Sequence, residues 1–256
     1  MRAAIGVLSL CLLPCALRAQ SFYLDPSIGL QWSAGVSAAM DAEHLSKQSI
    51  KSPTYGLMAR VQLDSRWELS TGARMGGASA GFRAHIPSTA LRGNSAAFNA
   101  SDAWSSNVLH VPFQIGYRFG QTSTAGHGLR LALAAGPQLD WQAFDYDPYD
   151  GRTQVFSSSS GNRITWRRAQ TDSARWGASV YLGAQARYYR RGRERAHLSL
   201  YLVWGLTPLS RYRLDYTLNG EAYETQLTAR SSALGFALTV PVRVAGRQKA
   251  PIQGGE

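Results

Sequence analysis

The sequence predicts an all-β fold, an eight-stranded antiparallel up-and-down transmembrane β-barrel. Apolar and polar residues alternate with a period of two in eight stretches, and the clearest of them runs from Val108 to Phe119. The connections between these stretches differ sharply in length. After the first 19 residues no apolar run is long enough to cross a bilayer as a helix, and a closed barrel would then satisfy every backbone group within hydrocarbon.

The first 19 residues have the pattern of a secretory signal peptide. Arg2 supplies a basic start, residues 3–17 form a short apolar run, and Leu17-Arg18-Ala19 is a suitable cleavage site. A lipoprotein signal ending at Cys15 is the alternative, but Pro14 stands where a small residue is needed. The predicted domains are a signal peptide at 1–19, an outer-membrane barrel at 20–244 and a flexible periplasmic tail at 245–256.

Loss of the signal peptide changes both the thiol content and the charge. Cys11 and Cys15 are the two cysteines of the sequence, so the mature chain would have none, which excludes disulfide scaffolds, cysteine-ligated metals and cysteine nucleophiles. The basic residues fall from 27 to 25 against 16 acidic residues, which leaves a net charge of +9. A basic exported protein can bind nucleic acid, but an anionic lipid surface is the simpler partner.

The expected strands follow one another along the chain. The first is expected to begin at Ile28, and the alternative is a start at Phe22 with an interruption at Pro26. The second and third form a hairpin around the tight turn at 64–66. Pro137 suggests a bulge or an edge defect in the fifth strand, and Asn219-Gly220 indicates a short hairpin inside a long connection. The eight strands are expected at 28–36, 55–64, 67–75, 107–119, 129–141, 176–189, 198–206 and 233–244.

The seven connections are long, short, long, medium, long, short and long. If both chain ends lie in the periplasm, every short turn lies there and every long loop lies at the cell surface, as in small outer-membrane barrels. A soluble barrel would instead enclose five arginines or expose an almost unbroken apolar surface, and both are unfavourable in water.

Aromatic side chains gather near both ends of the expected strands. Rings at the two membrane surfaces form the belts typical of membrane proteins, and ordinary core or turn positions are the alternative. The expected belts are Trp67, Tyr117, Phe119 and Tyr188 on the periplasmic side, and Tyr55, Trp141 and Trp176 on the outer side.

A leader, eight alternating strands, an inner face rich in Gly and Ala, and no second domain occur together in this chain. In this pattern the mature chain resembles the PorT-like family of outer-membrane β-barrel proteins, and its architecture is similar to the small OmpA/OmpX-type barrels. The resemblance implies the fold and the location, and some members of that family belong to secretion and gliding machinery. The basic tail after Val244 departs from the terminal aromatic residue with which such barrels usually end.

Charged side chains on the inner face are expected to form a network that bridges the strands. An anion-selective or ligand-gripping mouth is the alternative, although eight strands leave an interior that side chains nearly fill. The expected members are Arg60, Asp64, Glu68, Arg74, Arg118, Arg130, Arg187 and Arg243.

Candidates for catalysis or metal binding are few. Of the five histidines, His110 and His197 lie on the inner face of strands, and neither has a serine and a carboxylate nearby in sequence. Asp145, Asp147 and Asp150 alternate loosely without the pattern of a calcium loop, so a solvated loop tip is the better interpretation. We therefore expect no catalytic residue, no metal and no cofactor.

The largest connection carries arginines around a tryptophan. On an outer loop such residues would meet lipopolysaccharide phosphates before any nucleic acid, so we expect no nucleic-acid partner. The residues of this lipopolysaccharide hypothesis are Arg163, Trp166, Arg167, Arg168 and Arg175.

Together these patterns predict an integral outer-membrane protein with a structural, binding or secretion-accessory role and no catalytic activity. A narrow pore for small polar or anionic solutes is the alternative function. The expected partners are outer-membrane lipid, lipopolysaccharide, and proteins of envelope secretion or assembly.

Overall fold

The computed structural model describes residues 21–33, 37–38, 45–91, 97–120, 127–144, 151–157 and 162–246. The predicted signal peptide, the three aspartates considered for calcium and the tail from residue 247 onward lie outside these ranges. No helix within the described ranges is long and apolar enough to cross a membrane. Apart from one short 3-10 turn, η1 (Ser88–Ala90), the regular structure of these ranges is β-strand.

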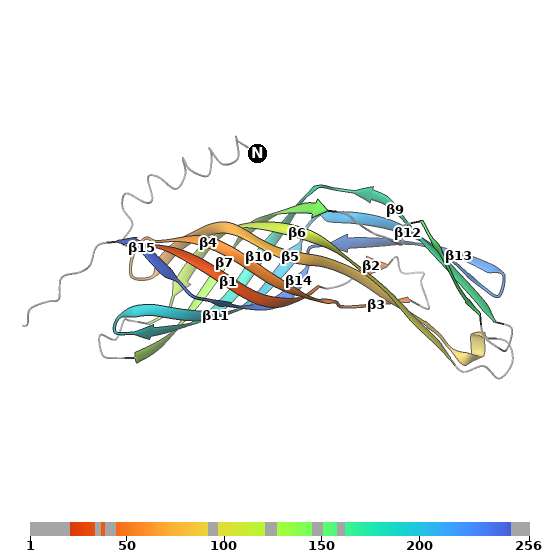
Figure 1. Cartoon of the computed structure of the whole chain (residues 1–256), viewed down its shortest axis with the longest axis horizontal. Coiled ribbons are helices and arrows are strands. Elements are labelled where there is room, and N and C mark those ends of the chain that lie inside the picture. The colour runs from red at the N-terminus through yellow and green to blue at the C-terminus, as the bar shows by residue number, and fades with distance from the viewer. Residues whose placement is uncertain are drawn as a thin grey trace, which may run out of the picture.

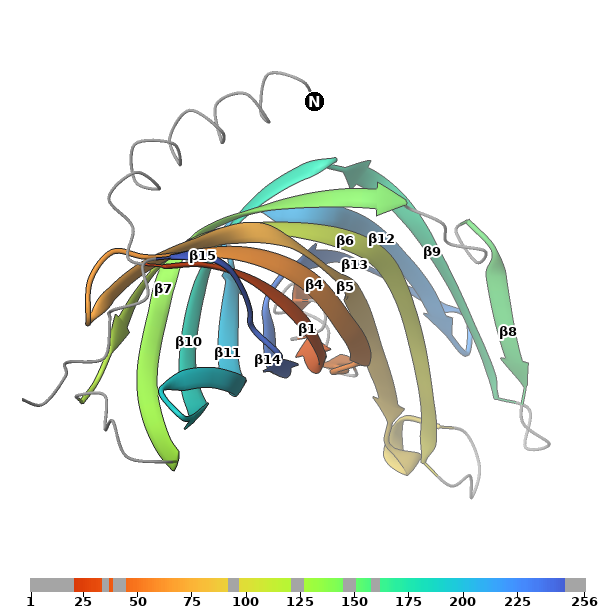
Figure 2. The same cartoon turned by 60° about the vertical axis from the view of Figure 1, so that its left-hand side comes forward.

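Eight strands close into an antiparallel barrel, as predicted. Strands that follow one another around the barrel pair with each other, and β14 pairs with β1 to complete the ring. Figures 1 and 2 show the strands running obliquely along one elongated body. They are β1 (Ser21–Ser33), β4 (Lys51–Gln62), β5 (Trp67–Ile86), β6 (Phe98–Arg118), β7 (His127–Phe144), β10 (Trp176–Arg190), β11 (Arg193–Gly205), and an eighth strand made of β14 (Ala233–Thr239) and β15 (Val242–Gly246).

The two ends of the barrel differ. At one end lie the three shorter connections, and there Ser21 pairs with Gly246, so the described chain starts and stops side by side; we call this the turn end. At the other end, the hairpin end, the chain forms long projections, which Figure 1 shows together on one side of the molecule. The alternation of short and long connections is therefore present as predicted.

The faces of the barrel strands are arranged as the alternation predicts. Leu131 is 60% exposed on the outside, whereas its neighbour Arg130 is buried on the inside. In β6, Ile115 points outward and Arg118 is buried in the interior. An apolar outer surface around a polar interior is the reverse of a soluble barrel.

The aromatic side chains form two groups on the outer surface. At the turn end the ring centroids of Trp67 and Tyr117 are 4.9 Å apart, and those of Tyr117 and Phe119 are 5.1 Å apart. Toward the hairpin end Trp141 and Trp176 pair at 6.3 Å. The expected separation of the aromatic residues into two belts is therefore present in the fold.

The interruption expected at Pro26 is absent, and the irregularity expected at Pro137 is present in a form other than a bulge. β1 starts at Ser21 and passes through Pro26 without interruption, because this proline faces the break between β14 and β15, where its carbonyl accepts from the N–H of Val240 at 3.2 Å. Pro137 does not produce a bulge, since β7 keeps one register against β10 across it. The pairs opposite Phe113 and Gln114 are missing there from the β6–β7 ladder, so the defect is a local gap.

The long connections are not plain loops, which corrects the sequence analysis. Five strands form a second sheet in the order β2-β13-β12-β9-β8, and β3 adds to β5. The predicted hairpin turn at Asn219-Gly220 joins β12 to β13, and both of its residues have positive φ. The bounds are β2 (Ser37–Ala38), β3 (Leu45–Lys47), β8 (Thr153–Ser157), β9 (Arg163–Ser173), β12 (Pro208–Leu218) and β13 (Glu221–Arg230).

This second sheet packs against the extended β5–β6 hairpin around an apolar core of its own. The Phe82 ring of β5 lies 5.9 Å from that of Trp166 in β9, and Phe156 of β8 lies 4.6 Å from Trp166. Buried leucines and tyrosines of β12 and β13 complete the core. We call the second sheet together with the outer part of the β5–β6 hairpin the extension.

β5 runs through both parts of the molecule, and its two faces exchange character on the way. In the barrel its inward positions hold Glu68 and Arg74, whereas farther along the same face holds Phe82 and Ile86. Arg83, between the last two, is exposed on the opposite face. A strand in lipid needs an apolar outer face and a strand in water needs an apolar inner face, so the reversal marks where the barrel ends.

Candidate functional site

The candidate site is the barrel interior, where buried charged side chains from seven strands meet. Alternation along each strand places every second side chain inside, and near the turn end many of these positions are ionisable. We call this group the lower network. Its members are Asp25 of β1, Arg60 of β4, Glu68 of β5, Arg118 of β6, Arg130 of β7, Arg187 of β10, and Glu194 and His197 of β11.

Arg60 is the centre of the lower network. Its Nε donates to Oδ2 of Asp25 at 2.6 Å, and its Nη1 donates to Oε2 of Glu194 at 3.0 Å and to Oε2 of Glu68 at 3.4 Å. The guanidinium carbon also lies 4.6 Å from the ring centroid of Tyr23. One arginine therefore joins carboxylates from three strands.

Glu68 links Arg60 to the opposite side of the interior. Nη1 of Arg187 donates to Oε2 of Glu68 at 2.7 Å, Nη2 donates to the other carboxylate oxygen, and Nε of Arg118 lies 3.8 Å from Oε2. His197 contacts Glu194 through Nδ1 at 2.9 Å. Each carboxylate of the lower network thus has at least one cationic partner, as burial of charge requires.

A second group of polar residues lies farther toward the hairpin end. Nε2 of Gln138 donates to Oδ1 of Asp140 at 2.8 Å and to Oγ of Ser179 at 2.9 Å, and Nδ1 of His110 lies 2.7 Å from the same Asp140 oxygen. The hydroxyl of Ser231, just before β14, donates to the other oxygen of Asp140. We call this group, with Arg74, the upper network.

Arg74 is held above two stacked tyrosines. Its guanidinium carbon lies 4.3 Å from the ring centroid of Tyr201 and 5.3 Å from that of Tyr181, and the two rings stack at 5.7 Å. Its Nη2 donates to Oε1 of Gln138 at 3.3 Å. Both rings are nearly completely buried, so this layer fills the interior between the β5 side and the β10–β11 side.

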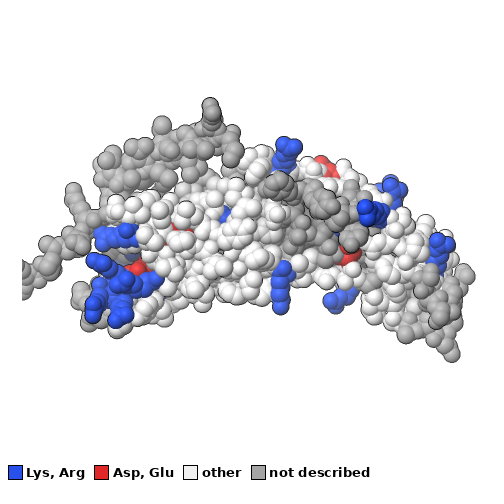
Figure 3. All heavy atoms as spheres, in the orientation of Figure 1, with Lys and Arg blue, Asp and Glu red and all other residues white. Residues whose placement is uncertain are grey.

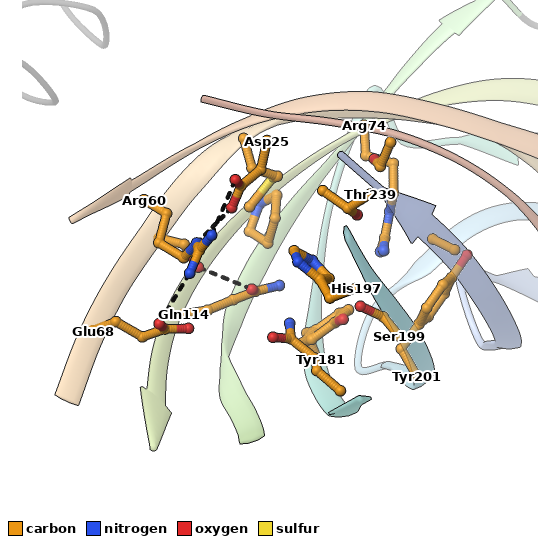
Figure 4. Close-up of a pocket in the computed structure, with 16 residues that line it drawn as sticks. Asp25, Arg60, Glu68, Arg74, Gln114, Tyr181, His197, Ser199, Tyr201 and Thr239 are labelled. Atoms are coloured by element: carbon orange, nitrogen blue, oxygen red, sulfur yellow. Dashed lines mark hydrogen bonds and ion pairs between the residues drawn. The ribbon is translucent and has the colours of Figure 1, made fainter. Parts of the chain in front are cut away.

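Between the two networks lies an internal cavity of about 50 Å³. Figure 4 shows Asp25, Arg60 and Glu68 on one side of it, with Tyr201 and Arg74 on the other. A cavity of this size holds a few water molecules at most. The interior is therefore a stack of two polar layers with a small cavity between them.

The upper network contains a serine, a histidine and an aspartate, but not in the geometry of a hydrolase. In a catalytic triad the serine bonds to the imidazole nitrogen that does not face the acid. Here Ser231 bonds to Asp140 instead, and within the described residues Nε2 of His110 has no hydrogen-bond partner. No group of three or more His, Cys, Asp or Glu residues in those ranges could hold a metal ion.

The structure brings together most of the predicted lumen residues. Arg60, Glu68, Arg118 and Arg187 meet in the lower network. Arg130 is buried beside them, with its guanidinium carbon 5.1 Å from the Tyr189 ring. Arg74 belongs to the upper network instead.

Asp64 and Arg243 are not in the interior, which corrects the prediction for both. Asp64 is exposed in the turn before β5, where its Oδ1 accepts from the backbone N–H of Arg66 at 2.6 Å and of Trp67 at 2.7 Å. These hydrogen bonds, with that from Trp67 the stronger, lower the pKa of the Asp64 carboxyl. Arg243 is exposed on β15 at the rim of the barrel.

Asp25, Glu194 and Asp140 were not among the predicted lumen residues, and His110 was placed on the inner face without a partner. Asp25 precedes the expected strand start at Ile28 and is included only in the alternative start at Phe22. Glu194 falls between the expected strands 176–189 and 198–206. Both residues are in strands. The pair His110 and Asp140 is separated by 30 residues and is joined only by the register of β6 against β7. Extending the alternation of β1 backward by three residues would have found Asp25.

The residues of the lipopolysaccharide hypothesis are divided by the fold. Arg163, Arg167 and Arg175 are exposed, whereas Trp166 and Arg168 are buried inside the extension at 3% and 2% exposure. The two buried residues are unavailable for surface contact, so the hypothesis now concerns the three exposed arginines and stays a prediction.

One comparison with known proteins agrees with this architecture. A family model described as "Outer membrane protein beta-barrel domain" matches residues 19–211. No curated protein matches the chain.

Similar solved structures include two proteins of Pseudomonas aeruginosa. The N-terminal β-barrel domain of OprF is 16% identical, with 88% of this chain and 99% of that chain covered and a TM-score of 0.38. The outer membrane protein OprG is 10% identical, with 89% and 98% covered and a TM-score of 0.43.

Proposed function

This chain belongs to the outer-membrane protein β-barrel domain family, and from that membership we propose that it is a non-conducting outer-membrane anchor that presents its extension to a protein partner. The role is structural and binding, as an accessory of envelope secretion or assembly, in line with the resemblance to the PorT-like family. The single observation that carries this proposal is the combination of a filled barrel interior with a separately packed extension.

The filled interior argues for an anchor over a pore. Ions crossing the barrel would have to pass both the lower network and the layer formed by Arg74, Tyr181 and Tyr201. In both layers the side chains are nearly completely buried and bonded across the barrel. The alternative function, a narrow pore for small polar or anionic solutes, would require both layers to rearrange.

The extension supplies the binding surface. Its outward face is polar and ordered by ion pairs, such as Nε of Arg213 to Oδ1 of Asp215 at 2.8 Å and Nη2 of Arg213 to Oε2 of Glu224 at 3.2 Å. These partners raise the pKa of Arg213, and the hydrogen bond that Arg213 donates to Asp215 is the largest cause. A sheet with an apolar core and a charged face can hold a fixed surface toward a partner.

We infer an orientation from the same features. The turn end, with both ends of the described chain, faces the periplasm, and the extension faces the outside of the cell. The reversal of the two faces of β5 supports a water-exposed extension.

The proposal is tested by conductance and by cross-linking. The purified full chain should give no single-channel currents in planar bilayers. A photo-reactive residue at Arg167, exposed on the extension, should capture an envelope protein in intact cells, and one at Leu131 on the lipid-facing surface should not. Stable channel openings by the unaltered protein, or equal capture at both positions, would overturn the proposal.

A further inference from the structure

The barrel wall is split at the turn end, between β11 and β15. β14 pairs with both β11 and β1, but β15 pairs with β1, and within the described residues no ladder joins it to β11. The β11–β14 ladder stops at the pair His197–Thr239, two residues before Pro241. Because proline has no N–H to donate, the ladder cannot continue in the same way through this position.

Each side of the split carries a β-bulge. The register of β11 against β10 shifts next to Tyr189 and leaves Arg195 without an opposite residue. The register of β15 against β1 shifts between Phe22 and Tyr23 and leaves Val244 without one. Bulges bend a strand and redirect its side chains, and they are common at barrel rims beside functional sites.

The split forms a groove of about 620 Å³, which we call the seam groove. Arg193 and Arg195 of β11 and Arg243 of β15 line it, and all three are exposed. Glu194 is the one acidic residue among the described lining residues, and its carboxylate is turned inward to Arg60. Within the described ranges neither Arg193 nor Arg195 forms an ion pair, so their charge is not neutralised there.

Exposed apolar side chains line the seam groove together with the arginines. Val242 and Val244 line it and are 53% and 56% exposed. Figure 3 shows basic side chains gathered at this end of the molecule, beside a barrel surface with few charged side chains in this view. The groove therefore combines guanidinium groups with apolar surface, at the edge of the lipid-facing belt.

We propose that the seam groove binds an anionic glycerophospholipid. The guanidinium groups of Arg193, Arg195 and Arg243 bind the headgroup phosphate, since charge-assisted arginine–phosphate pairs are strong and directional. The first acyl carbons lie against Val242 and Val244. Within the described residues no ladder joins β11 to β15, so backbone N–H groups on these edges would offer further donors.

Two other occupants fit less well. A free phosphate would use the arginines but would leave the exposed valines without a partner. A strand of another protein would need regular edges, and Pro241 and the two bulges interrupt them, as they do in natural sheets that avoid edge pairing. A phospholipid accounts for both the charge and the apolar surface.

The test counts lipids bound to the full chain purified in detergent. Phosphatidylglycerol and phosphatidylcholine of equal chain length are titrated separately and bound lipid is counted by native mass spectrometry. We expect selective binding of phosphatidylglycerol, and a loss of about fivefold in affinity for each arginine removed in R193Q, R195Q and R243Q, alone and combined. The matched control removes three exposed arginines elsewhere, as R83Q, R152Q and R230Q, and should bind as the unaltered protein does.

Any of the following binding results would overturn the proposal. Equal binding of both lipids would show that the groove does not select an anionic headgroup. Equal losses in the control would show a general attraction to charge. Complete displacement by inorganic phosphate at millimolar concentration would show a site for the free ion. Displacement only by an acidic peptide would show a protein site. If the triple variant does not fold, the single variants and a triple lysine variant, which keeps the charge and should keep the selectivity, decide the question.

Discussion

Glu68 of β5 and Arg187 of β10 form an ion pair across the barrel interior, with Nη1 of Arg187 2.7 Å from Oε2 of Glu68. The two residues are 119 positions apart, and strands β6 and β7 lie between theirs in the barrel order. The pair therefore does not follow from strand pairing. It ties opposite walls of the barrel together.

Removing Glu68 should destabilise the barrel more than removing any exposed acidic residue. Glu68→Ala leaves Arg187 and Arg118 short of a counter-charge while both stay buried, which costs about 3–5 kcal/mol in the free energy of unfolding. Urea unfolding in lipid vesicles, followed by tryptophan fluorescence, measures it.

The control for this experiment is Glu221→Ala, at an exposed position of β13, which should change the free energy of unfolding by less than about 0.5 kcal/mol. In a double-mutant cycle, Glu68→Ala with Arg187→Ala should cost less than the sum of the single variants. Additive losses would show that the pair does not couple the two walls.

The turn before β5 should make stability depend on pH. The backbone N–H groups of Trp67 and Arg66 lower the pKa of Asp64 in the folded protein. Its contribution is therefore present above the unfolded value of about 4 and is lost as the pH falls through the lower folded value. Between about pH 6 and pH 2, the urea midpoint should fall less in Asp64→Asn than in the unaltered protein. The same fall in both proteins would contradict the role given to Asp64.

Sequence reasoning found the barrel because lipid imposes a strict rule on every second residue. Leu131 must face outward and Arg130 inward, and no tertiary contact can reverse that assignment without placing a charge in hydrocarbon. The tight turn at Asn219-Gly220 was found for a similar reason, since its backbone conformation requires particular residue types.

The extension was missed because its pattern has the opposite polarity. Trp166 and Arg168 alternate with exposed neighbours in β9, but the run begins and ends among polar residues and was assigned to a loop. The lower network was only partly found because its members meet through barrel closure and register. Asp25 of β1 and Glu194 of β11 both accept hydrogen bonds from Arg60, although 168 residues lie between them in the chain. No local sequence pattern predicts such a contact.

The extension should unfold without the barrel. Trp166→Ala removes a ring that packs on Phe82 and Phe156 and should cost about 3–5 kcal/mol within that core. Limited proteolysis should then cut the chain between β8 and β9. The barrel should stay resistant to the protease, and its electrophoretic mobility should still change when the sample is heated. Arg163→Ala, an exposed change on the same strand, is the control. Loss of the barrel together with the extension would show one cooperative unit.

The boundary between lipid and water should appear as a difference between two equally exposed apolar residues. Leu133 in β7 and Val155 in β8 are each 51% exposed, but Leu133 is on the outer face of the barrel and Val155 is on the extension. Leu133→Arg should cost about 2–4 kcal/mol in vesicles, because a lipid-facing position near the middle of a strand does not tolerate a charge. Val155→Arg should cost less than about 0.5 kcal/mol, because its side chain remains in water. Folding into vesicles under urea measures both. In detergent micelles, which lack a fixed bilayer, the difference in cost between the two variants should shrink. An equal cost for both variants in vesicles would instead place the extension inside the membrane.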